Sequence, residues 1–167
     1  TQCFAPCVER RQAGSAASVA IPLKRLGVTS AIVGTVGDDA AGKAILARLR
    51  GAGLGVEGIR TVEDRPPGIC ISPSRPDGGR TYLSVMGAIA AADIATLRQM
   101  KRSCLEPARW VFLTGLFCLE GLSIGEVADI FEALKKDGKT TLLDTGWDVA
   151  GWERGAVAAV RRLLKFT

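Results

Sequence analysis

The sequence predicts an α/β protein in which helices cover a parallel sheet. Apolar runs of strand length alternate along the chain with longer stretches whose apolar residues recur at helical spacing. The chain has 167 residues, of which 47% are hydrophobic, and this is enough for one domain with a buried core. Strands that alternate with helices pair in parallel through crossover connections.

The first part of the chain is predicted to form a helix, a strand and a second helix. Small and apolar residues at helical spacing predict the first helix over 14–26, and the apolar run 30–36 predicts a buried strand. Asp38 or Asp39 is expected to cap a helix over 40–50.

The segment 55–86 has a different character. Short β-like pieces alternate there with turn-rich sequence, and the Pro-Asp-Gly-Gly sequence at 76–79 predicts a hairpin turn. We therefore expect a small sheet that lies apart from the main layer.

The remainder of the chain returns to alternating helices and strands. In chain order, a short helix capped by Asp93, a strand, an amphipathic helix, a strand and a final helix are predicted over 94–100, 109–114, 122–136, 140–143 and 153–164. An alternating fold that stops directly after a helix is expected to be truncated.

The absence of histidine and the scatter of charge exclude several functions. Without imidazole the chain has no Ser-His-Asp or Cys-His nucleophile and no His-ligated zinc. The net charge of +5 comes from basic pairs scattered along the chain without interleaved aromatic residues, which is typical of solvated helix faces. No nucleic-acid partner is expected.

The cysteines and the hydropathy pattern favour a cytoplasmic protein without a membrane partner. The five cysteines include no CxxC pair, so neither a disulfide framework nor a zinc ribbon is expected. Cys70 and Cys118 lie in apolar runs and are expected to be buried. No apolar run reaches the length of a membrane helix, and no signal-peptide pattern opens the chain.

Two glycine-containing stretches could indicate ligand sites. Residues 53–58 fit G-x-G-x-x-G but follow a helix, which indicates a helix-to-strand turn rather than a dinucleotide site. Residues 13–20 open a helix with small side chains, among which the Ser15 and Ser18 hydroxyls suit a polyhydroxy substrate. Tight helix packing is the alternative interpretation of that stretch.

Asp144 and Arg80 also have two interpretations each. Asp144 comes just after a predicted strand, where α/β sheets place ligands, but it could instead be a helix cap or a loop residue. Arg80 follows the predicted hairpin turn and could be an exposed charge or a contact to a ligand.

An ordered set of motifs resembles the PfkB, or ribokinase-like, carbohydrate kinase family. The set consists of a glycine-containing helix start, V-G-D-D-x-x-G, Pro-Gly, G-G-R-T, F-L-T-G and L-D-T-G-W-D, at 14–27, 36–42, 67–68, 78–81, 112–115 and 143–148. The order of the set is more specific than any one of its members. The resemblance covers nearly the whole chain.

The resemblance implies a three-layer α/β/α ribokinase-like core, incomplete here, with a small β-sheet lid. Residues 1–167 would form a partial domain with lid strands inserted over about 55–86. The implied activity is transfer of a phosphoryl group from ATP, with Mg2+, to a sugar hydroxyl. The residues that the motifs and the resemblance indicate for substrate binding are Gly14, Ser15, Ser18, Arg80, Gly115 and Asp144.

This sequence departs from the family pattern at its catalytic motif. The family's catalytic Asp lies in a G-A-G-D sequence near the C-terminus, whereas here Gly51-Ala52-Gly53 is followed by Leu54. The position of a substrate-binding Asn is occupied by Ser18. We therefore expect the chain to be a kinase fragment without activity of its own and without a metal site.

A noncatalytic protein is the alternative. It would bind sugar, or assemble through its lid, without phosphorylating anything. In either case an interrupted sheet exposes an edge and apolar surface, so a homodimer or other self-association is expected.

Overall fold

The computed structural model describes residues 7, 9–75, 77–99 and 104–167. In chain order its elements are α1 (Ser15–Arg25), β1 (Ala31–Gly37), α2 (Ala40–Gly51), β2 (Gly55–Val62), β3 (Ile69–Ile71), β4 (Leu83–Val85), the 3-10 helix η1 (Gly87–Ala91), α3 (Ile94–Gln99), β5 (Trp110–Thr114), the 3-10 helix η3 (Leu116–Cys118), α4 (Ile124–Lys136), β6 (Thr140–Asp144), α5 (Arg154–Leu163) and the 3-10 helix η4 (Leu164–Phe166). This order confirms the predicted α/β alternation. Met100 of the predicted helix 94–100 and Pro76 of the predicted turn lie outside the described residues.

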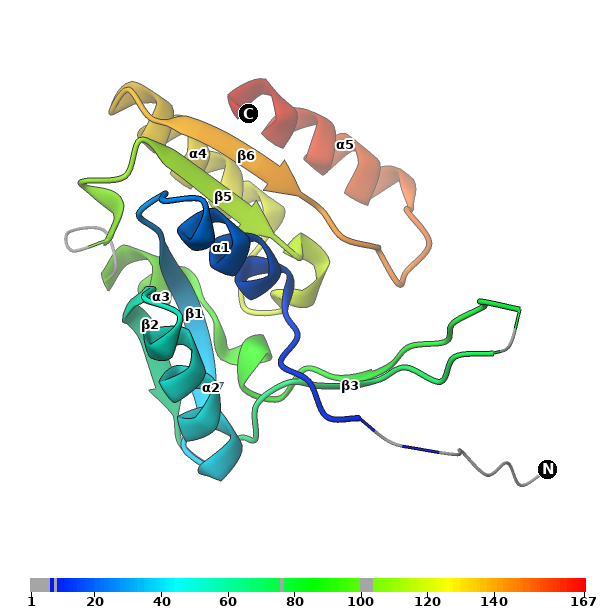
Figure 1. The fold of residues 1–167 in the computed structure, drawn as a ribbon. Coiled ribbons are helices and arrows are strands. Elements are labelled where there is room, and N and C mark those ends of the chain that lie inside the picture. The colour runs from blue at the N-terminus through cyan, green and yellow to red at the C-terminus, as the bar shows by residue number, and fades with distance from the viewer. Residues whose placement is uncertain (1–6, 8, 76, 100–103) are drawn as a thin grey trace.

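The strands form three pairs (Figure 1). β1 pairs with β2, and β5 pairs with β6, both in parallel as the alternation predicts. β3 and β4 form an antiparallel hairpin, which Figure 1 shows extending away from the helices and the parallel strands.

β2 belongs to the main layer, which differs from the prediction that 55–62 form part of the small separate sheet. It pairs with β1, and its Val56 is buried in one cluster with Leu49 of α2 and Ile32 of β1. This burial explains the pairing, because β1, α2 and β2 together close a β-α-β unit around a shared core. Of the described strands predicted for the small sheet, β3 and β4 pair with each other, in an antiparallel sheet.

The buried apolar residues of the described part form two clusters. One lies between α1, α2 and the β1–β2 pair and contains Ala20, Ile32, Leu49, Leu54 and Val56. The other lies between α4, α5 and the β5–β6 pair and contains Leu116, Leu122, Val127, Ala128, Phe131, Leu134, Val160 and Leu163. α1 packs against both β1 and β5 and so connects the two parts, while α4 and α5 cover the opposite side of β5 and β6 (Figure 1).

Side chains and glycines fix the helix ends. Asp39, not Asp38, caps α2, since its Oδ1 accepts a hydrogen bond from the Gly42 N–H at 2.7 Å. Ser123 and Glu126 form a reciprocal capping box at the start of α4. Within the described part of the chain, no helix combines the length and the apolar character needed to cross a membrane.

The β3–β4 hairpin leaves apolar side chains in solvent. Ile69, Ile71, Leu83 and Val85 are all exposed. Cys70 is also exposed, so the prediction that it is buried is wrong. The reason is that the hairpin lies outside both apolar clusters of the described residues.

Candidate functional site

The carboxyl ends of β5 and β6 bring polar groups together. The two strands pair without a register shift, which places Thr114 opposite Asp144. The Thr114 Oγ1 hydroxyl donates to Asp144 Oδ2 at 2.7 Å, and the Gly146 N–H donates to Asp144 Oδ1 at 3.0 Å. These two hydrogen bonds hold the carboxylate in one orientation at the end of the sheet.

The Asp144 carboxylate is exposed and ionised at neutral pH. The Thr114 hydroxyl, together with the Gly146 N–H, lowers the pKa of Asp144 below its ordinary value and outweighs the small opposing effect of desolvation. Each oxygen accepts one hydrogen bond within the protein and keeps acceptor capacity toward solvent. The group is therefore a fixed anionic acceptor, suited to hydroxyl or amine donors of a ligand.

Glycines line the strand ends beside this carboxylate. Gly115 and Gly146 have φ angles of 70° and 66°, a backbone conformation that favours glycine. A Cβ on Gly146 would lie 3.6 Å from the Gly115 Cα, so the loops after β5 and β6 are in contact. The Gly115 N–H also donates to the Asp144 carbonyl at 3.1 Å. The structure thus brings together two of the predicted site residues, Gly115 and Asp144.

Asp148 fixes the loop that follows β6. Its carboxylate is buried and accepts hydrogen bonds from the backbone N–H groups of Ala150, at 2.9 Å, and Trp152, at 3.1 Å. Both of its oxygens are therefore used within the loop. Asp148 is buried whereas Asp144 is exposed, so Asp148 fixes the loop and only Asp144 is accessible to a ligand.

The start of α1 supplies a second group of predicted residues. Gly14 precedes the helix with a φ of 106° and open space around the position of a Cβ. Ser15 and Ser18 are exposed on the first turn. α1 packs against β5, and Figure 1 shows its N-terminal end on the side of the molecule to which the carboxyl ends of β5 and β6 point. Gly14, Ser15 and Ser18 therefore lie on the same side as Asp144.

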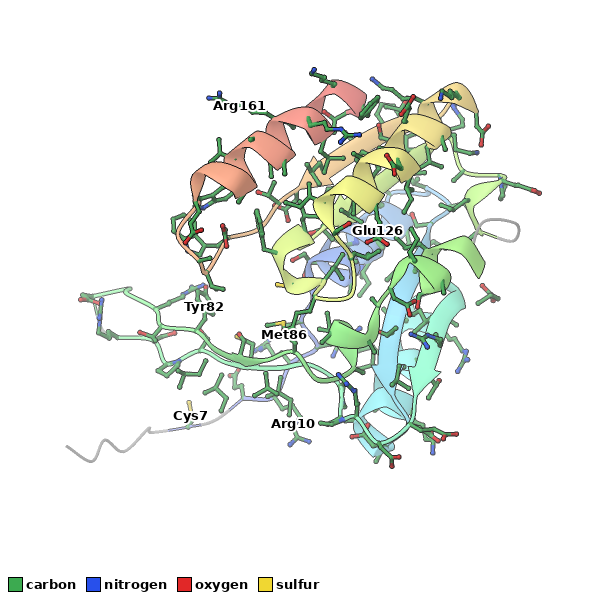
Figure 2. All side chains as sticks on the ribbon, turned by 180° about the vertical axis from the view of Figure 1, so that it is seen from behind. Cys7, Arg10, Tyr82, Met86, Glu126 and Arg161 are labelled. Atoms are coloured by element: carbon green, nitrogen blue, oxygen red, sulfur yellow. The ribbon has the colours of Figure 1, made fainter. Side chains whose placement is uncertain are left out.

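Arg80 lies apart from these residues. It forms an isolated bridge with Ser74 next to the turn of the hairpin, and its side chain is exposed. Tyr82, two residues further along the chain, and Met86, just after β4, have side chains on the side of the hairpin that faces the rest of the molecule (Figure 2).

Sequence reasoning missed Thr114 as a partner of Asp144. Thr114 was visible within the F-L-T-G motif, but its role depends on the pairing of two strands that lie 30 residues apart. It also missed the ring contacts of Phe117 and Trp152, whose centroids are 5.1 Å apart. No local pattern in the sequence signals either contact.

A divalent metal has no evident holder in this part of the fold. Among the described residues, no group of three or more Asp, Glu and Cys side chains is placed to hold a metal ion. Asp144 is a single carboxylate, already bonded to Thr114 and Gly146. The residues present do not fit a Mg2+ site by themselves, so we derive no step through that ion.

The fold is that of the ribokinase-like kinases. Similar solved structures include a Burkholderia thailandensis nucleoside kinase in complex with inosine, with a TM-score of 0.76, 19% identity and coverage of 100% of this chain and 50% of that chain. An uncharacterized sugar kinase from Pyrococcus horikoshii in complex with ATP has a TM-score of 0.76 and 21% identity over 95% of this chain and 51% of that chain. The fructokinase from Xylella fastidiosa has a TM-score of 0.74 and 16% identity over 98% of this chain and 55% of that chain.

A comparison of the sequence with protein families identifies the family within this fold. The profile of the pfkB family carbohydrate kinases matches residues 4–164, and the chain belongs to that family. The chain spans about half the length of the solved relatives it matches. No curated protein matches it significantly.

Replacing Thr114 by Val should raise the pKa of Asp144 toward its ordinary value, because the largest cause of the lowered pKa is the Thr114 hydroxyl. A carboxyl 13C NMR titration measures it. Thr145→Val is the matched control, since the Thr145 hydroxyl donates to the Gly146 carbonyl and not to Asp144. An unchanged pKa in Thr114→Val would show that the hydrogen bond does not exist in solution.

The lowered pKa of Asp144 also determines how the stability of the protein changes with pH. Because the folded-state pKa of Asp144 lies below its unfolded value, the stabilising contribution is fully present above the unfolded pKa and is lost as pH falls through the folded pKa. Thr114→Val should therefore reduce the loss of stability that accompanies acidification. Thermal unfolding at pH 7 and at low pH measures this difference.

Proposed function

We propose that this chain provides the substrate-binding part of an ATP-dependent sugar kinase and that its 167 residues alone do not transfer a phosphoryl group. The observation that carries the proposal is the fixed, ionised Asp144 at the glycine-lined ends of β5 and β6, in a chain of the pfkB family. In open α/β sheets, ligands bind beyond the carboxyl ends of the strands.

The chemistry of the site favours a substrate with several hydroxyl groups. Asp144 accepts hydrogen bonds from hydroxyl donors, and Ser15 and Ser18 both donate and accept. Gly14 leaves open space beside the start of α1, so a ligand can approach the backbone there. The similar structures include a fructokinase and a nucleoside kinase with inosine, which supports a sugar or a nucleoside as the substrate.

ATP and Mg2+ are proposed as cofactors because the activity of the family implies them. A similar sugar kinase was solved with ATP. The 167 residues contain no Gly-Ala-Gly-Asp sequence and no Walker A sequence. Phosphoryl transfer depends on positioned charges around the transferring group, and none of the residues described above supplies them. We therefore assign this chain the binding and orientation of the acceptor, and no part in the transfer itself.

The cytoplasm is the compartment that we propose, with a small sugar and a second copy of the chain as partners. Cys7, Cys70 and Cys118 form no disulfide with another described cysteine, which suits a reducing compartment. Lys43 and Lys136 are each paired with an acidic side chain, and Figure 2 shows Arg161 pointing away from α5. The basic residues come as pairs scattered along the chain without interleaved aromatic residues, which favours solvated helix faces over a nucleic-acid surface. No nucleic acid or membrane partner is proposed.

Replacing Asp144 by Asn should weaken sugar binding about tenfold or more, because a hydrogen bond to a charged group is lost. Calorimetry with fructose, ribose and inosine measures the affinity. Asp137→Asn is the matched control, since Asp137 is exposed and lies before the opposite end of the same strand. Equal affinities in the two variants would contradict the assignment of Asp144.

The purified wild-type chain should also release no ADP from ATP and Mg2+ with any of these substrates. A coupled assay for ADP measures it. Turnover above that of a heat-denatured sample would refute the claim that the 167 residues lack catalysis, while leaving the role of Asp144 in binding to be judged by the calorimetry.

A second role, assembly through the lid hairpin, is favoured by the exposed apolar side chains of that hairpin. Ile69, Ile71, Leu83 and Val85 are each more than half exposed. Each strand of a two-stranded hairpin also has an unpaired edge, which is a template for another strand. We propose that these surfaces pair two copies of the chain.

Leu83→Lys should shift the wild-type dimer toward monomer in sedimentation velocity, because a buried charge opposes apolar pairing. Phe112→Lys, at an exposed position of β5, is the comparison. A dimer that dissociates only in Phe112→Lys would move the interface to β5 and β6, and a monomeric wild-type chain would exclude self-association.

A further inference from the structure

Trp147 lies three residues beyond Asp144, in the loop that leads from β6 to α5, and its side chain is 72% exposed. A single exposed aromatic side chain is ordinary on a protein surface and by itself indicates nothing. This indole differs because ring contacts and loop hydrogen bonds fix its position, and because Asp144 lies three residues before it in the chain.

The ring of Trp147 belongs to a series of aromatic side chains that pack edge to face. Its ring meets that of Trp152 edge to face, with centroids 6.2 Å apart and an interplanar angle of 79°. Trp152 in turn meets Phe117 at 5.1 Å and 78°. Phe117 and Trp152 are partly buried against the cluster under α4 and α5. The three rings therefore form a continuous row from the core of the β5–β6 part to solvent, and Trp147 is its outermost member.

The backbone on both sides of Trp147 is also fixed. On one side, Gly146 donates its N–H to Asp144 Oδ1 at 3.0 Å. On the other side, the buried Asp148 accepts the N–H groups of Ala150 and Trp152. An exposed ring on a loop held in this way loses little conformational freedom when a ligand covers it, and this lowers the cost of binding.

The neighbouring chemistry specifies the ligand. Asp144, the last residue of β6, presents an ionised acceptor, and Trp147, three residues further along the chain, presents an exposed indole in the loop that begins at that end of the strand. A ligand that uses both groups needs a hydroxyl donor and a ring with one flat, weakly polar face. The ring of a sugar and the base of a nucleoside both meet this requirement.

We propose that Trp147 is the platform on which the ring of the substrate lies while a hydroxyl of the same molecule donates to Asp144. This inference rests on the proposed function, because it concerns the same site. It adds a specificity-determining residue: acceptors without a ring, such as glycerol or other open-chain polyols, would lack the contact with the indole and would bind more weakly.

The experiment compares Trp147→Ala and Trp147→Phe with wild type, using calorimetry with inosine, fructose and glycerol. Trp147→Ala should weaken inosine or fructose binding about tenfold, the size expected for loss of one stacking contact. Trp147→Phe should retain most of the affinity, because it keeps an aromatic face. Glycerol binding should be weak and the same in all three proteins.

Trp110→Ala is the matched control, because Trp110 is also exposed, at 58%, but begins β5 at the end of the strand away from Asp144. It should bind as wild type does. Thermal unfolding of each variant establishes that its affinity is that of a folded protein. In a Trp110→Phe background the remaining indoles are those of Trp147 and Trp152, and ligand should also protect their fluorescence from acrylamide quenching.

The outcomes separate this inference from the proposed function. If Asp144→Asn loses affinity while Trp147→Ala binds as wild type, the platform is overturned and the substrate site stands. Equal losses in Trp147→Ala and Trp147→Phe would also overturn the platform, since an aromatic face would not be what matters. If wild type binds neither inosine nor fructose, both fail. A preference for inosine assigns the base to Trp147, and a preference for fructose assigns the sugar ring.

Discussion

The parallel pairing of β5 with β6 is the constraint on which the rest of the site depends. The register runs from Trp110 opposite Thr140 to Thr114 opposite Asp144 without a shift. Side chains alternate across a strand, so Val111, Leu113 and Leu143 pack into the cluster under α4 and α5. The same alternation places Thr114 and Asp144 on the opposite face. A slip of one residue would turn Asp144 toward that core.

Several features of the site follow from this pairing. The strand ends bring Gly115 and Gly146 into contact, so the two loops support each other. In the loop after β6, Asp144 accepts the Gly146 N–H, and the buried Asp148 accepts the N–H groups of Ala150 and Trp152. Asp144 and Trp147 both remain exposed. Short, charge-assisted hydrogen bonds do this positioning with few residues, and no packing of Asp144 into the interior is needed.

Much of the fold was predictable because its signals are local. Helical spacing and strand-length apolar runs predicted the order of elements, and the carboxylates before the helix predicted a cap at Asp38 or Asp39, of which Asp39 is the cap. The turn at 53–58 was predictable from its place after a helix, and β2 does begin there. The position of Asp144 at the carboxyl end of a strand was also predictable, and this is the edge at which α/β sheets place ligands.

What the sequence could not reveal depends on contacts between distant segments. β2 contains two glycines and two charged residues, so its pattern resembled the lid more than a core strand, and only its pairing with β1 places it in the main layer. Cys70 lies in an apolar run, yet it is exposed, because the hairpin that carries it lies outside both apolar clusters of the described residues. The link between Thr114 and Asp144, and the row of rings ending at Trp147, likewise appear only when β5 and β6 are side by side.

The central claim is that a hydroxylated ligand binds at the carboxyl ends of β5 and β6. The most direct measurement is a 1H–15N NMR titration of the labelled chain with fructose and with inosine. The account predicts that the largest amide shifts occur at Gly115, Gly146 and Trp147, with little change at Gly138 before the opposite end of β6. Shifts confined to the hairpin or to α5, or no shift at any of these amides, would contradict it.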